Sequence, residues 1–158
     1  MTCSKRLTFI TCKGSTLKSQ RKKRGMGFMD YEDDQMCFVC GKQNADGLHL
    51  HFEMIGDDRI RTEFTPPKRF QGWKDILHGG IIATILDEVM VNGAYLRNIH
   101  AVTTKLEMRL RRPAAIGARL IFYGQIIKQD TRTVTTKAWA EQEDGTIVAE
   151  ATGLLMKV

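Results

Sequence analysis

The sequence predicts an α+β domain in which an antiparallel sheet of about six strands wraps around one long buried helix. A chain of 158 residues has room for one domain of ordinary size. Its hydrophobic pattern contains one strong helix, apolar around most of its circumference, and several strand-like segments separated by short turns. Such a helix has to be covered by the sheet if its apolar surface is to leave water.

The first two strands are predicted at residues 48–55 and 59–64. In the first segment, LHLHFEMI, apolar residues alternate with others at the period of a half-buried strand. The residues GDDR form a typical tight turn, so the second segment, RIRTEF, returns as the partner in a hairpin. The next segment contains Pro66, Pro67 and Gly72 and is predicted to be a loop, because proline has no amide hydrogen for a helix interior.

The helix is predicted over residues 78–97. On a helical wheel one wide face carries the large apolar side chains, which are Ile81, Ile82, Ile85, Leu86, Val89 and Met90. Four more strand-like segments follow at residues 102–112, 118–128, 132–142 and 146–158, and their connections PAAIG, QDTR and EDG have turn composition. Two strands, one buried helix and four strands form the hotdog fold.

The formal charge of +6 belongs to the N-terminal part of the chain. Residues 1–27 hold eight basic side chains and no acidic one, whereas the remaining residues hold 16 basic and 18 acidic side chains. The composition of this segment resembles an organelle transit segment and lacks the apolar core of a secretory signal. We expect residues 1–27 to be a disordered or removable tail, residues 28–158 to be the hotdog domain, and the protein to be cytoplasmic, or located in an organelle matrix if the tail directs it there.

The residues that suggest chemistry lie on the predicted helix. The first amides of a helix have no intrahelical acceptor and lie at the positive end of its dipole, so those of Gly79 and Gly80 form a natural oxyanion site. Asp87 lies seven residues further along, at roughly 10 Å for a rise of ~1.5 Å per residue. The two features could meet across a two-fold dimer. On spacing alone, the alternative is that Asp87 bridges to a partner such as Arg109 and that the glycines serve turn geometry.

The string HGGIIATILDE, preceded by Gln71 and Gly72 and followed by VTTKLEMRLRRP, resembles the hotdog-fold acyl-CoA thioesterases of the PaaI-like type. The similarity includes the motif CFVCG…GLHLHF and covers about residues 36–158. It implies hydrolysis of acyl-CoA thioesters to a free acid and coenzyme A. Some members of the family have an asparagine where this chain has Gly72, so a side-chain role at that position is absent.

The resemblance also implies roles for individual residues. The backbone N–H of Gly79 polarises the thioester carbonyl, Asp87 is the general base or nucleophile, and Thr103 helps to hold the hydrolytic water. His78 is expected to fix the glycine turn rather than to act as the base. Gly80 is expected to contribute to substrate binding.

The position of Thr103 is left open by the strand pattern. The apolar residues Leu106, Met108 and Leu110 alternate, which places Thr104 rather than Thr103 on their face. Thr103 is therefore predicted either to face the helix, as the resemblance implies, or to point toward an interface or solvent.

A basic edge precedes Pro113. Arg111 and Arg112, with Arg109 nearby, suit the phosphates of coenzyme A, because guanidinium groups bind phosphate in a bidentate manner. The alternative is a solvated strand face. We predict Arg111, Arg112 and Gln71, in the loop before the helix, as substrate-binding residues.

The four cysteines are too few for a disulfide framework and indicate a reducing compartment. Cys37 and Cys40 form a CxxC motif that, with His49 and His51, suits zinc in spacing. One CxxC with one HxH is weak evidence for a metal, so the sequence predicts no metal site. No cofactor is expected, because coenzyme A is part of the substrate.

The predicted partners are an acyl-CoA substrate and a second copy of the chain, in a homodimer or a dimer of dimers. No run of ~18 uncharged apolar residues exists, so no membrane-spanning segment is predicted. No nucleic-acid partner is predicted for the domain. The alternative functions are a non-catalytic acyl-CoA-binding hotdog module and nucleic-acid association through the basic tail, which would depend strongly on salt.

Overall fold

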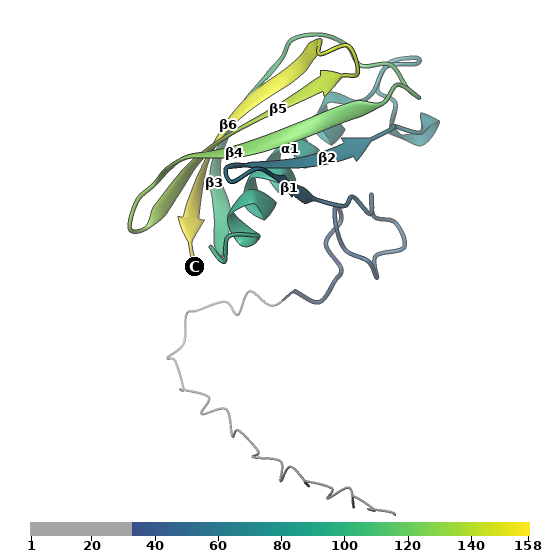
Figure 1. Cartoon of the computed structure of the whole chain (residues 1–158). Helices are drawn as coiled ribbons and strands as arrows, with labels where there is room; N and C mark the ends of the chain where they lie inside the picture. Colours follow the sequence, from purple (N-terminus) through teal and green to yellow (C-terminus); the bar gives the residue numbers. More distant parts are fainter. Residues whose placement is uncertain (1–32) are drawn as a thin grey trace, which may run out of the picture. The chain divides into compact units, whose positions relative to one another are not determined.

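The computed structural model describes residues 33–158, and the predicted tail of residues 1–27 lies outside them. A single antiparallel sheet of six strands, in the order β1-β2-β4-β5-β6-β3, curves around one helix (Figure 1). In chain order the elements are β1 (Glu53–Ile55), β2 (Arg59–Phe64), the short 3-10 helix η1 (Lys68–Phe70), α1 (Gly79–Tyr95), β3 (Ala101–Leu110), β4 (Leu120–Gln129), β5 (Thr133–Gln142) and β6 (Ile147–Lys157). The predicted hotdog architecture is confirmed.

The strand predicted over residues 48–55 is shorter than expected, because only Glu53–Ile55 pairs with β2. His49 has a φ of 53°, a left-handed conformation that regular strands do not adopt. The amides of Leu48 and Leu50 instead donate hydrogen bonds of 2.8 Å to carbonyl groups of the CFVC turn. This part of the chain therefore holds the turn against the domain instead of extending the sheet.

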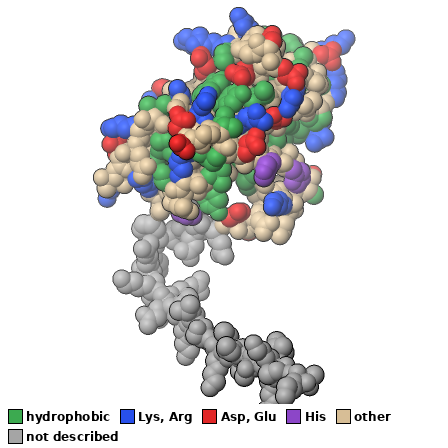
Figure 2. Space-filling model, viewed as in Figure 1, with side chains coloured by type: hydrophobic (Ala, Val, Ile, Leu, Met, Phe, Trp, Pro, Cys, Tyr) green, Lys and Arg blue, Asp and Glu red, His purple; other side chains and the backbone are tan. Residues whose placement is uncertain are grey.

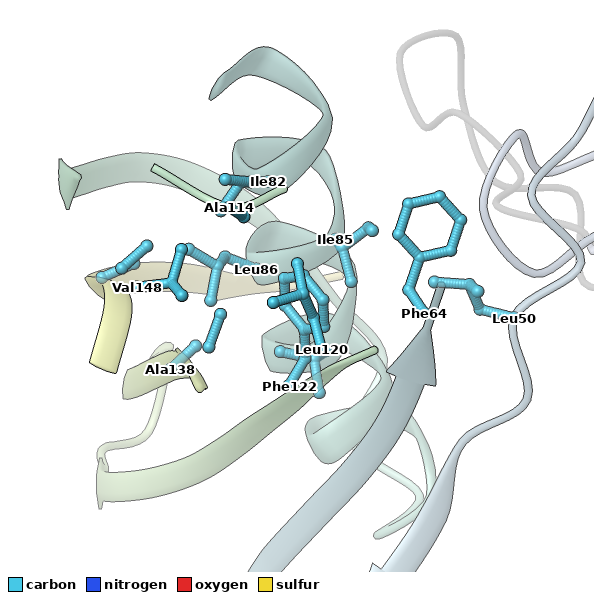
Figure 3. Close-up of a cluster of buried hydrophobic side chains, with 14 of the residues drawn as sticks. Leu50, Phe64, Ile82, Ile85, Leu86, Ala114, Leu120, Phe122, Ala138 and Val148 are labelled. Atoms are coloured by element: carbon cyan, nitrogen blue, oxygen red, sulfur yellow. The ribbon is translucent and has the colours of Figure 1, made fainter. Parts of the chain in front are cut away.

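The core lies between α1 and the concave face of the sheet, as Figure 3 shows. Ile82, Ile85 and Leu86 of the helix belong to the same buried cluster as Leu120 and Phe122 of β4. Each of these five side chains is buried, and burial of such a side chain contributes roughly 1.5–3 kcal/mol. The wide apolar face predicted for the helix is therefore the face that the sheet covers.

A glycine allows the helix to approach the sheet closely. A Cβ added to Gly124 of β4 would lie 2.7 Å from the carbonyl oxygen of Val89 in α1. Any larger residue would push the helix away from the sheet. This contact positions the helix, and with it the polar residues that α1 carries.

The face of the sheet turned away from α1 carries apolar side chains among Lys, Arg, Asp and Glu (Figure 2). On this face the rings of Tyr123 and Trp139 stack with centroids 5.1 Å apart. Over residues 33–158, no helix has the length and hydropathy needed to cross a bilayer.

Candidate active site at the start of the helix

His78 caps the helix. Its ring Nδ1 accepts a hydrogen bond of 2.9 Å from the amide of Gly80. Its carbonyl oxygen accepts from the amides of Ile81 at 3.0 Å and Ile82 at 3.4 Å. His78 therefore holds the glycine turn, the role expected for it.

In the first turn of α1, the amide of Gly79 is the one that has no hydrogen-bond acceptor among the described residues. The next three amides are all bonded to His78. The expectation of two free glycine amides is thus corrected, because the Gly80 N–H is engaged by the His78 ring. One N–H at the positive end of the helix dipole remains available to an anionic oxygen.

A cavity of about 710 Å³ opens at this helix start. Its walls come from the loop before α1, from the first turn of α1 and from the end of β3. They include Trp73, His78, Gly79, Ile82, Leu110, Arg111 and Arg112. Trp73 is 82% exposed, so it forms a solvent-exposed part of the cavity wall.

The three predicted substrate-binding side chains differ in their positions. Arg111 and Arg112 both line the cavity. Arg111 also donates from Nε to Glu150 at 2.6 Å, whereas no ion pair in the described part of the chain involves Arg112. Gln71 is not among the lining residues, and its Oε1 accepts a hydrogen bond of 3.3 Å from the amide of Asp75 within the loop. The geometry thus favours the two arginines over Gln71 as substrate contacts.

Asp87 is half-buried and bonded to Thr103. The Thr103 hydroxyl donates to Asp87 Oδ1 at 2.7 Å. The alternative bridge from Asp87 to Arg109 is not formed, because none of the ion pairs among residues 33–158 involves Asp87. The structure therefore brings together the acid and the hydroxyl that the resemblance to thioesterases implies.

A β-bulge explains why the strand pattern left Thr103 ambiguous. In the pairing of β3 with β6, Thr103 lies opposite Leu155 and Lys105 lies opposite Leu154, so Thr104 is an extra residue. One extra residue reverses the alternation. Thr103 therefore shares a face with Leu106, which is the face turned toward α1.

The free amide and the carboxylate do not share a cavity within one chain. Gly79 and Asp87 are eight residues apart on α1, or about 12 Å at a rise of ~1.5 Å per residue. Neither Asp87 nor Thr103 lines the cavity at Gly79. One chain thus holds the free amide of Gly79 and the carboxylate of Asp87 at two separate places.

A second polar cluster joins the CFVC turn to the helix. Cys40 Sγ donates to Glu88 Oε1 at 3.1 Å, and Cys37 Sγ donates to the same oxygen at 3.5 Å. Asn92 Nδ2 also donates to Glu88 Oε1, at 2.8 Å. Burial and the neighbouring carboxylate raise the pKa of the Cys40 thiol well above its ordinary value.

The sequence suggested other partners for the two cysteines. His49 and His51 are not part of the cluster, and Glu88 takes their place. The contact between Cys40 and Glu88 joins residues 48 positions apart, so no spacing in the sequence signals it.

Comparison with known proteins agrees with this architecture. The model of the family "Thioesterase superfamily" matches residues 74–149. The acyl-coenzyme A thioesterase THEM4 of Xenopus laevis is 26% identical over 119 residues, which are 73% of this chain and 54% of that protein. The chain thus spans about half the length of this curated relative.

Two solved structures illustrate the shared fold. The thioesterase superfamily protein RHA08564 superposes with a TM-score of 0.73 and 26% identity, over 77% of this chain and 60% of the other. The PaaI protein of E. coli superposes with a TM-score of 0.65 and 16% identity, over 69% of this chain and 83% of the other. The domain formed by residues 33–158 therefore has the hotdog fold, and it is similar to proteins of the thioesterase superfamily.

Proposed function

We propose that the protein hydrolyses acyl-CoA thioesters to a free acid and coenzyme A, at a site that two protomers form together. One observation carries the proposal beyond the family. Gly79, whose amide has no acceptor among the described residues, lines a cavity, whereas the hydrogen-bonded carboxylate of Asp87 lies two turns away and outside that cavity. A site that uses both groups on one carbonyl needs Gly79 from one protomer and Asp87 from its partner.

The edge strand β3 offers a way to bring the two groups together. β3 pairs with β6 on one side and has no partner strand on its other side among the described residues. Its Leu110 end lies beside Gly79, because a Cβ on that glycine would be 2.8 Å from Leu110 Cδ1. Its Thr103 end holds Asp87 through a hydrogen bond.

Antiparallel pairing of two β3 strands about a two-fold axis places the Leu110 end of one strand near the Thr103 end of the other. Such pairing gives each of two identical sites one Gly79 amide and one Asp87 carboxylate. It also covers Leu110, whose side chain is 51% exposed in the single chain. We therefore propose a homodimer that forms through β3.

The chemistry follows from these two groups. Attack on a thioester builds negative charge on the carbonyl oxygen, and one well-placed N–H donor such as that of Gly79 stabilises it by about 3 kcal/mol. In one route Asp87 removes a proton from the attacking water, and the C–S bond then breaks to release coenzyme A thiolate, which takes up the proton. In the other route Asp87 attacks the carbonyl itself and expels the thiolate, and water then hydrolyses the mixed anhydride. In both routes the Thr103 hydroxyl holds Asp87 Oδ1 and leaves the second oxygen for the reaction.

The coenzyme A part of the substrate is proposed to bind along the arginine side of the cavity. Arg112 has no ion pair with other described residues, and Arg111 is only partly engaged by Glu150. Guanidinium groups bind phosphate oxygens in a bidentate manner. The curated relative from Xenopus carries the name of an acyl-coenzyme A thioesterase, which supports the same class of substrate.

Release of free thiol from a panel of acyl-CoA esters tests this function. Replacing Asp87→Asn is expected to lower kcat by at least about 10²-fold, the usual contribution of a general base, while the dimer and the melting temperature are retained. Asp130→Asn, an exposed carboxylate beyond the end of β4, serves as the matched control and is expected to keep full activity. An active Asp87→Asn enzyme would refute the role of this residue, and a wild-type protein that binds acyl-CoA without releasing thiol would identify the non-catalytic module.

A further inference from the structure

We propose that Cys37, Cys40 and Glu88 form a binding site for a thiophilic divalent cation, and that Zn²⁺ is the ion that fits it best. This site is separate from the proposed thioesterase chemistry, which uses Asp87 and Gly79. It also departs from the sequence-based prediction of no metal site, which considered the two histidines as the partners of the cysteines.

The spacing of the three ligand atoms suits a small tetrahedral ion. The two sulfurs and one oxygen of Glu88 lie within 4.8 Å of one another. Zinc binds thiolates at ~2.3 Å and carboxylates at ~2.0–2.2 Å, so neighbouring ligand atoms around it are about 3.5 Å apart. The distances of 3.1 Å from Cys40 Sγ and 3.5 Å from Cys37 Sγ to Glu88 Oε1 already approach this value.

The turn that carries the two cysteines is built to hold both sulfurs on one side. The amide of Val39 donates to Cys37 Sγ at 3.3 Å, an interaction that strengthens when the sulfur is a metal-bound thiolate. The amide of Gly41 donates to the Cys37 carbonyl at 2.9 Å and closes the turn. A Cβ at Gly41 would lie 2.5 Å from backbone atoms of Cys37, so this position requires glycine.

Glu88 is available as the third ligand. It forms no ion pair with any described Lys, Arg or His side chain. Asn92 donates to its Oε1 at 2.8 Å and orients the carboxylate toward the sulfurs, as a second ring of hydrogen bonds does around many metal ligands. All three ligand residues are half-buried, which limits access of competing water.

The proposed complex of the divalent ion with two thiolates and one carboxylate carries a net charge of −1. Cys37 and Cys40 each release one proton to solvent, and the ion gains two thiolates and one carboxylate. A water molecule completes the four ligands that zinc prefers. Because Glu88 lies on α1 beside Asp87, the ion would link the CFVC turn to the helix that carries the proposed catalytic acid.

Metal content and Co²⁺ spectra of the full-length chain test the site. Because Cys3 and Cys12 lie outside the described residues, both are replaced by serine in every sample, so that Cys37 and Cys40 supply all the thiols. The expected results are one Zn²⁺ per chain after dialysis and, on Co²⁺ substitution, thiolate-to-cobalt charge-transfer bands with tetrahedral d–d bands. These readouts do not depend on thioester hydrolysis, so a failed thioesterase assay would leave them interpretable.

Three variants and two controls assign the ligands. Cys37→Ser, Cys40→Ser and Glu88→Gln are each expected to weaken Zn²⁺ binding by at least tenfold, whereas His49→Ala and His51→Ala leave it unchanged. Glu88→Gln preserves the size of the side chain, so it remains informative if a cysteine variant fails to fold. Absence of bound zinc, loss of zinc in the histidine controls, or a Cys37–Cys40 disulfide in the purified protein would overturn the proposal.

Discussion

Thr103 and Asp87 form the most informative contact at the scale of single residues. The hydroxyl of Thr103 donates to one oxygen of Asp87 at 2.7 Å, and both side chains are half-buried. A half-buried carboxylate is costly to desolvate without a hydrogen-bond donor. The threonine therefore stabilises the acid and fixes which of its oxygens faces the proposed water.

Removal of this hydroxyl is expected to reduce the rate without abolishing it. Thr103→Ala should lower kcat about tenfold or more and change KM little, because a misoriented base mainly reduces stabilisation of the transition state and affects substrate binding little. Thr103→Ser keeps the donor and should restore most of the rate. The check is steady-state kinetics of both variants by thiol release, and a serine variant as slow as the alanine variant would contradict the role of the hydroxyl.

At the scale of elements, the start of α1 is the feature on which the proposed carbonyl site depends. The ring of His78 accepts a hydrogen bond from the amide of Gly80, and its carbonyl oxygen accepts from the amides of Ile81 and Ile82. In the first turn only the N–H of Gly79 has no acceptor among the described residues. The backbone of His78 has φ −65° and ψ 129°, which is the extended conformation favoured before proline. Proline is also well tolerated at the first position of a helix.

This geometry allows the N–H of Gly79 to be deleted with little disturbance of the fold. Gly79→Pro removes the donor, and Gly79→Ala keeps it while adding a Cβ at the same place, 2.8 Å from Leu110 Cδ1. Gly79→Pro is expected to lose about 10²–10³-fold in kcat, and Gly79→Ala much less. Circular dichroism and thermal melts should show that both variants fold, and equal losses in the two would point to crowding against Leu110 instead of loss of the N–H.

At the scale of the whole molecule, the proposed site depends on which protomer supplies each group. If Gly79 and Asp87 of the same chain acted together, a dimer with one Asp87→Asn chain and one Gly79→Pro chain would contain no intact site. If the groups come from different protomers, the same dimer contains one intact site and one with both changes. The same-chain site and the two-protomer site therefore predict opposite activities for this mixed dimer.

Co-expression of the two variants with different affinity tags isolates this mixed dimer. It is expected to have about half of the wild-type activity, because one of its two equivalent sites is complete. Each variant purified alone should be nearly inactive. A mixed dimer as inactive as its parents, or a wild-type monomer with full activity, would exclude the two-protomer site.

The sequence by itself was sufficient for the features that depend on local pattern. The period of the apolar residues predicted α1 and five of the six strands closely, and the position of His78 just before the helix predicted its cap. The resemblance to thioesterases pointed to Asp87 and Gly79, whose catalytic roles stay predictions. Turn composition predicted every connection between β3 and β6. These features can be predicted because side-chain period and backbone preference act between residues close together in the chain.

Only the tertiary structure decided the features that depend on contacts between distant segments. The bulge at Thr104 arises from pairing with β6, and it turns Thr103 toward Asp87. The cluster of Cys37, Cys40 and Glu88 forms because the CFVC turn packs on α1. The separation of Gly79 and Asp87 along the helix already followed from the sequence. That neither Asp87 nor Thr103 lines the cavity at Gly79 was decided only by the structure, because the cavity forms where the loop before α1, the first turn of α1 and the end of β3 pack together.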